Sequence, residues 1–198
     1  MTDFNDSVLR RGLNSISRNR QLMFALLLCE RMMSSLDRFS NDTGFDGIIY
    51  REFLDDVWLH LAGNGNLTSY REAAEECLDR APDTAEFDHP LTSAALNAAL
   101  SVGATMSFLV DYDVDHVIEA AGLARDTVAL YAQSIETTPP RSLGFKEIME
   151  HPLVQQELRQ QAEDLEFLES LSTDVPQELI LLIREQAERA AKRLPPEN

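Results

Sequence analysis

The sequence is poor in cysteine, in basic residues and in long apolar runs, and each shortage excludes a class of protein. The longest apolar run, Leu22 to Cys29, is eight residues long, whereas a membrane-spanning helix needs roughly 18 to 20. The N-terminus lacks the basic, apolar and small-residue order of a signal peptide. We therefore expect a soluble cytoplasmic protein that does not cross a membrane.

Only two cysteines occur, and both lie in apolar surroundings. Cys29 belongs to the most apolar stretch, and Cys77 lies on a helical apolar stripe with Tyr70, Ala73, Ala74, Leu78 and Ala81. Both are predicted to be small core residues rather than a disulfide or a metal-binding pair.

Basic residues are outnumbered two to one by acidic residues, 17 against 34, for a net charge of −17. Nucleic-acid binding needs a clustered basic surface, and only residues 1–20, with four arginines and two aspartates, carry a small excess of positive charge. An acidic surface also repels anionic lipids and favours solubility and basic partners. We therefore expect neither nucleic acid nor membrane among the partners.

Helix-forming residues dominate what is present. Leucine and alanine total 48, against 17 for valine and isoleucine, which favours helices over strands. The sequence predicts one all-α domain over residues 1–198, an orthogonal or bundle-like array of about seven or eight helices. The apolar periodicity and the turn residues predict helical segments at residues 6–16, 19–40, 47–61, 70–81, 92–110, 114–135, 145–150, 152–171 and 176–193.

Two of these segments are expected at the centre of the molecule. Residues 19–40 are apolar nearly all round, which is typical of a buried helix. Residues 92–110 are rich in alanine, serine and glycine, which allow close approach of helix backbones. Asp46 and Asp174 are expected to cap the helices that follow them.

Metal and catalytic motifs fail on spacing. The run from Asp111 to Asp115 resembles the start of a calcium loop, but His116 and Gly122 occupy the positions where that loop needs glycine and glutamate. We interpret it as an acidic turn that caps the next helix. Glu86 and His89 have the spacing of a di-iron motif, but no second copy exists. We find no serine elbow, Walker loop or dinucleotide fingerprint and predict no metal, cofactor or catalytic residue.

One group of polar residues stands out where the apolar run ends. Charges at the boundary of a buried helix are usually paired, because an unpaired buried charge costs several kcal/mol. We expect a structural salt-bridge network here, with a ligand or partner site as the alternative. The group consists of Glu30, Arg31, Tyr50, Arg51, Asp55 and Trp58.

The same region resembles a known family. The residues that carry the resemblance are Cys29-Glu30-Arg31-Met32, Thr43-Gly44-Phe45, Tyr50-Arg51, Trp58, Ala81-Pro82-Asp83, Phe87-Asp88, Pro152-Leu153-Val154 and Glu157. They are similar to the YjaG-like family of bacterial proteins, whose function is unknown. The resemblance covers residues 15–172, and the C-terminal helix in residues 173–198 departs from it. It implies a soluble, cytoplasmic, all-helical bacterial protein and supplies no catalytic residues.

The leading hypothesis is a non-enzymatic protein–protein interaction module. It could form a homodimer through its small-residue helix or its C-terminal helix. The alternative is a small-molecule-binding protein or enzyme with a pocket near Glu30, Arg31, Tyr50, Arg51 and Trp58. A third hypothesis, based on charge alone, is an acidic protein that blocks a basic partner.

Overall fold

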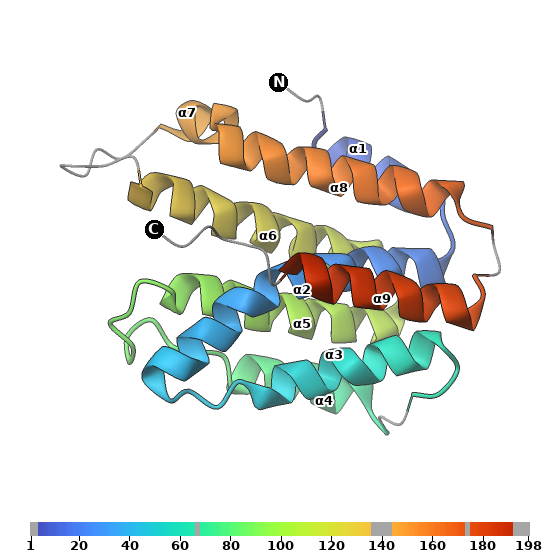
Figure 1. Ribbon diagram of the computed structural model, residues 1–198, viewed down its shortest axis with the longest axis horizontal. Coiled ribbons are helices and arrows are strands. Elements are labelled where there is room, and N and C mark those ends of the chain that lie inside the picture. The colour runs from blue at the N-terminus through green and yellow to red at the C-terminus, as the bar shows by residue number, and fades with distance from the viewer. Residues whose placement is uncertain (1–3, 66–67, 136–143, 173–174, 192–198) are drawn as a thin grey trace.

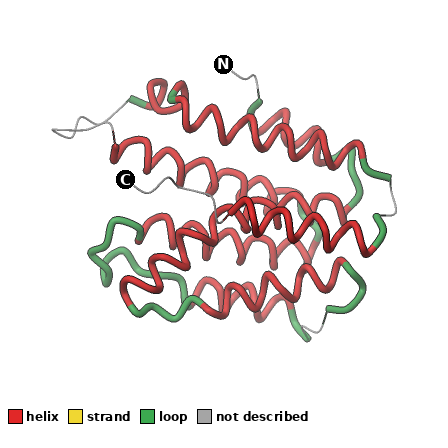
Figure 2. The backbone as a smooth tube through the Cα atoms, in the orientation of Figure 1, coloured by secondary structure: helices red, strands yellow, loops and turns green. Residues whose placement is uncertain are grey.

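The longest helix, α2 (Arg18–Thr43), passes through the centre of the protein and contacts α5, α6, α8 and α9. The computed structural model describes residues 4–65, 68–135, 144–172 and 175–191. Within these ranges the chain forms nine helices and no strand (Figure 2), which confirms the all-α class. The other helices are α1 (Asp6–Leu13), α3 (Ile48–Leu61), α4 (Tyr70–Asp79), α5 (Thr92–Asp111), α6 (Val114–Ile135), α7 (Phe145–Glu150), α8 (Pro152–Ser170) and α9 (Gln177–Ala191).

The helices are stacked in layers (Figure 1). In that view α7, α8 and α1 lie at the top, α6 beneath them, α2, α5 and α9 in the middle, and α3 and α4 at the bottom. The nine helices of the described residues correspond to the nine helical segments predicted from the sequence, so the estimate of about seven or eight was slightly low.

The interior of α2 is apolar on every side, as the sequence predicts. From Gln21 to Met33 all but two of its residues are buried, since neighbouring helices cover it all round. The helix ends at Gly44, whose φ of 77° lies in the left-handed region that favours glycine.

The small residues of α5 are used inside the molecule. Ala95, Ala98, Ala99, Ser101 and Gly103 are all buried, and α5 packs against α2, α4 and α6. By length and composition α5 would also qualify as a membrane-spanning helix, but 61% of its apolar window is buried within the protein. This is typical of a core helix.

Three local expectations need correction or fall outside the described residues. Gly47, not Asp46, is the N-cap of α3, because the helix begins one residue later than predicted. Leu78 extends the apolar period of α4 but is 58% exposed, since only the face with Ala73, Ala74 and Cys77 is buried. Asp174 lies outside the described residues.

Close packing of α4 on α5 generates a stability prediction. A Cβ at Gly103 would lie 3.2 Å from the Cβ of Cys77, so Gly103→Leu should lower the free energy of unfolding by about 1–3 kcal/mol through overpacking. The matched control is Gly122→Ala, whose Cβ would meet only the end of the Arg125 side chain, at 3.6 Å. It should raise stability by about 0.5–1 kcal/mol. Urea unfolding measures both, and equal effects would contradict the packing described.

Candidate functional site

The carboxylate of Glu30 is buried in the interface between α2 and α3. Its exposed fraction is 0%, and Nη1 of Arg51 donates to both of its oxygens, at 2.9 and 3.0 Å. Nε1 of Trp58 donates to Oε1 at 3.0 Å. Arg51 and Trp58 are seven residues apart, which places them two turns apart on the same face of α3. The buried charge is thus neutralised and hydrogen-bonded within the protein.

Asp55 extends this pairing to the last helix. It lies 3.8 Å from Nη1 of Arg51 and accepts a hydrogen bond of 2.6 Å from Nη2 of Arg184 on α9. Arg184 also pairs with Glu188, one turn further along α9, at 2.7 Å. Charge pairs therefore connect α2, α3 and α9.

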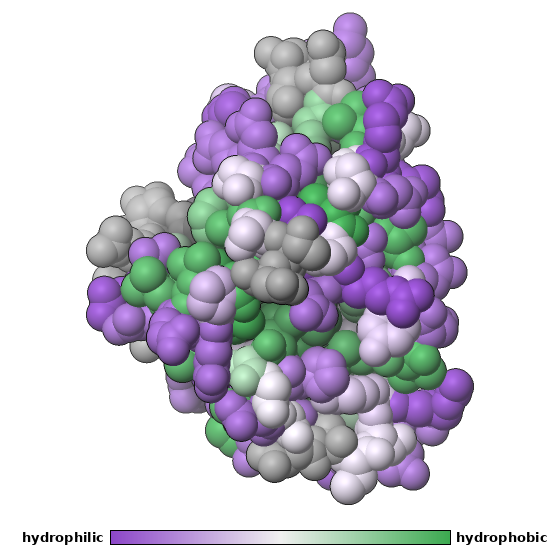
Figure 3. Space-filling view, turned by 90° about the vertical axis from the view of Figure 1, so that its right-hand side faces the viewer, coloured by the Kyte–Doolittle hydropathy of each residue, from purple (hydrophilic) through white to green (hydrophobic). Residues whose placement is uncertain are grey.

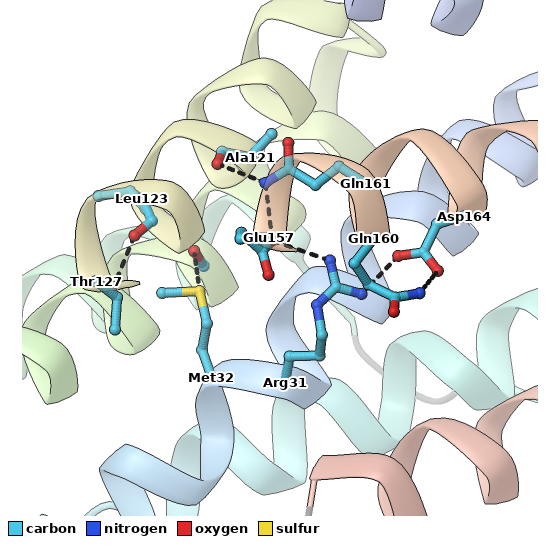
Figure 4. A network of polar contacts seen from close by, with 10 residues as sticks. Arg31, Met32, Ala121, Leu123, Thr127, Glu157, Gln160, Gln161 and Asp164 are labelled. Atoms are coloured by element: carbon cyan, nitrogen blue, oxygen red, sulfur yellow. Dashed lines mark hydrogen bonds and ion pairs between the residues drawn. The ribbon is translucent and has the colours of Figure 1, made fainter. Parts of the chain in front are cut away.

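Arg31 lies beside Glu30 in the sequence but binds different partners. Its guanidinium donates to Asp164 at 2.5 Å and to Glu157 at 3.2 Å, both on α8 (Figure 4). Burial by itself would lower the pKa of Arg31, but the two carboxylates outweigh it and hold the pKa above its usual value. Successive residues of a helix point about 100° apart, so Glu30 faces α3 while Arg31 faces α8.

Two glutamines complete the second network (Figure 4). Nε2 of Gln161 donates to Glu157 at 2.8 Å and to the carbonyl of Ala121 on α6 at 3.1 Å. Gln160 donates to Asp164 at 3.0 Å. Nε of Arg31 is the one atom of this group that is buried without a hydrogen bond. The network joins α2, α6 and α8.

Tyr50 points toward α4, in a direction different from those of Glu30 and Arg31. It is fully buried, its hydroxyl donates to the carbonyl of Cys77 on α4 at 3.1 Å, and burial raises its pKa. The structure therefore brings together Glu30, Arg51, Asp55 and Trp58, and it separates Arg31 and Tyr50 from them. The predicted salt-bridge network exists, but as two networks on different sides of α2.

Sequence reasoning missed the acidic partners of Arg31. Glu157 and Asp164 are seven residues apart and adjoin the core positions Leu158 and Leu165, so both lie near the buried face of α8. That spacing is the signal that distinguishes them from the outward-facing acids of the same helix.

The other groups considered as metal or catalytic sites, which are the acidic turn and the two cysteines, have contacts that serve the fold. Among the described residues, no group of three or more His, Cys, Asp or Glu side chains could hold a metal ion. In the acidic turn, Asp111 and Asp113 accept backbone N–H bonds from Asp113 and Asp115, at 2.9 and 3.0 Å, which supports the capping interpretation. Both cysteines are buried and free, as predicted.

Two surface hollows lie away from these networks. One, of about 520 Å³, lies between α1 and α8. The other, of about 740 Å³, is lined by residues of α1, α5, α6 and α7. Neither is lined by any of the six residues singled out from the sequence.

The buried ion pair predicts a non-additive pair of mutations. Glu30→Met removes the buried partner of Arg51 and leaves it only the more distant Asp55. It should cost about 3 kcal/mol of unfolding free energy, at the low end for a broken buried pair because Arg51 is partly exposed. The double variant Glu30→Met/Arg51→Met should lose less than Glu30→Met alone. Urea unfolding of the three proteins tests this, and additive losses would contradict it.

The buried thiols predict slow modification and sensitivity to alkaline pH. Burial raises the pKa of Cys29 and of Cys77 from 9.0 to about 12. Both should resist alkylation at neutral pH in the folded protein and react readily in urea. Above about pH 9 the thiols ionise in the unfolded chain only, so the free energy of unfolding should fall as pH rises. A Cys29→Ala/Cys77→Ala variant should lose that part of the pH dependence.

Comparisons with known proteins agree with this architecture. The chain is 29% identical to the uncharacterized protein YjaG of Escherichia coli K12 over 140 residues, 70% of each chain. It is 28% identical over the same share to the YjaG protein of Salmonella typhimurium LT2. The crystal structure of a DUF416 family protein from Shewanella baltica OS155 superposes with a TM-score of 0.78 at 19% identity, covering 91% of this chain and 93% of that one.

The family match is longer than the resemblance seen in the sequence. The model of the DUF416 family, a protein family of unknown function, matches residues 9–192. This range includes α9, so the C-terminal helix does not depart from the family as expected. The resemblance to YjaG-like proteins is confirmed: the chain belongs to the bacterial DUF416 family, whose function is unknown.

Proposed function

We propose that this protein is a non-enzymatic, cytoplasmic protein–protein interaction module. The observation that carries the proposal is the state of its interior charges. Glu30 and Arg31, the charged groups that a buried site would use, are engaged by Arg51, Trp58 and the acids of α8. Chemistry needs groups that can bind and exchange protons with a substrate, and these are already occupied.

The surface supplies what an interaction module needs. Large apolar side chains are exposed on several helices, including Phe145 at 81% and Leu182 at 47%. On the face shown in Figure 3, apolar side chains are interspersed with hydrophilic ones, and a non-obligate protein interface can have the same mixture as the rest of a protein surface. The net charge of −17 favours partners with basic surfaces.

Self-association belongs to the same proposal, and the structure favours one of its two expected routes. The small residues of α5 are already packed against other helices. The outer face of α9 keeps Leu181 and Leu182 exposed, at 44% and 47%. A homodimer would therefore use α9 rather than α5.

Purification from a bacterial host tests the proposal. The tagged full-length chain should co-purify with another protein at a fixed ratio, or it should form an oligomer. In either case light scattering should give a mass well above the 22.3 kDa of one chain. Native mass spectrometry identifies what is bound.

Two outcomes would contradict the proposal. One is a mass of one chain across micromolar concentrations with no protein enriched over a tag-only control. The other is a co-purified small molecule in place of a protein, which would favour the small-molecule alternative.

A further inference from the structure

Helix α1 lies directly against α8, and their junction forms a groove. A Cβ at Gly12 would clash with Cδ2 of Leu165, so the absence of a side chain at Gly12 lets the helices approach. One turn further along both helices, Ser15 hydrogen-bonds Glu169 at 3.4 Å. The helices therefore run in the same direction. We call the hollow of about 520 Å³ between them the α1–α8 groove.

The floor of the α1–α8 groove is apolar. Phe4 and Val8 contribute from the α1 side, and Ala162 and Leu165 from α8. Val8 is 37% exposed, whereas Leu165 is 6% exposed, so the floor extends from the exposed surface to the edge of the core. From Arg159 to Glu169 the α8 wall spans eleven residues, which is about 15 Å or nearly three helical turns.

The rim contains unpaired arginines, which are rare in the described part of the chain. Most basic side chains in the described part of the chain contact a carboxylate, a backbone carbonyl or an aromatic ring. Among the residues that the structure describes, three arginines have no such contact, although acidic residues outnumber basic ones two to one over the whole sequence. They are Arg11, Arg71 and Arg159, and two of them, Arg11 and Arg159, line this groove.

The α8 wall also has negative charge. Glu163 and Glu166 are exposed and lie one turn apart, where like charges repel. Arg159 precedes Glu163 by four residues, which is the less favourable order for an ion pair on a helix, and no bond joins them. The rim therefore presents both signs of charge without pairing them.

The apolar floor and the mixed charges of the rim together indicate which kind of ligand fits the groove. A free anion, a nucleic acid or an anionic membrane would meet the glutamates of α8 as well as the arginines. An amphipathic helix can place an apolar stripe on the floor and both signs of charge along its edges, which fixes its register.

We propose that the α1–α8 groove binds an amphipathic helix of another protein. The helix spans about three turns, directs carboxylates toward Arg11 and Arg159, and directs basic side chains toward the glutamates of α8. This inference rests on the proposed interaction function, but it requires neither α9 nor self-association.

Site-specific photo-crosslinking in the bacterial host tests the inference on the full-length chain. A benzoylphenylalanine crosslinker replaces Val8 in the groove. In a reference protein it replaces Ile48 on α3, which is 60% exposed and does not line the groove. Mass spectrometry then sequences the captured segment. The expected segment has apolar residues three and four apart, flanked by charges of both signs.

Charge reversal identifies the contacts. Arg11→Glu/Arg159→Glu should reduce the Val8 crosslink about tenfold or more. The matched control Arg71→Glu reverses an equally unpaired arginine on α4 and should leave the yield unchanged. Circular dichroism and urea unfolding of the variants confirm that they remain folded, as expected for substitutions at exposed positions.

Several results would overturn the inference. They are a Val8 yield no higher than that at Ile48, a captured segment without an apolar stripe, a captured lipid or nucleic acid, and equal effects of the two charge reversals. Crosslinking at Ile48 alone would contradict helix binding in the α1–α8 groove but would not contradict the proposed interaction function. Absence of capture at both sites, together with a single-chain mass, would overturn both.

Discussion

The passage of α2 through the centre of the molecule is the constraint on which the rest of the structure depends. A helix covered on all sides must bury whatever its sequence contains, and here that includes Glu30 and, in large part, Arg31. Each charge needs a partner because an isolated buried charge costs several kcal/mol. The helices packed on either side supply those partners, so the charges of α2 fix where α3 and α8 can lie.

The two networks divide the fold between them. The Glu30 network holds α3 against α2 and reaches α9 through Asp55 and Arg184. The Arg31 network holds α8 against α2 and reaches α6 through Gln161. The buried polar groups of these networks hold the helices in their relative orientation. The proposed recognition function therefore falls to the outer surfaces, where α1 and α8 form a groove with unpaired charges of both signs.

Sequence reasoning succeeded where a pattern depends on local spacing. The bounds of α6 and α7 follow from periodicity and turn residues, and the burial of Cys29 and Cys77 follows from their apolar surroundings. It failed at Asp46, because α3 begins one residue later than predicted and Gly47 is its N-cap. It also failed at Leu78, which lies at the edge of the apolar face of α4 and is exposed. The C-terminal helix, expected to depart from the family, lies within the family match.

The sequence by itself determined that the chain is helical, that α2 is buried, and that charged residues next to the apolar run need partners. These follow from composition and from the 3.6-residue period, which act over a few turns of one helix. The tertiary structure alone decided that Glu30, Arg31 and Tyr50 face three different helices, and that Arg11 and Arg159 meet across one groove. Such pairings join residues on different helices, from 21 to more than a hundred positions apart in the sequence, and they depend on how whole helices pack rather than on any local pattern.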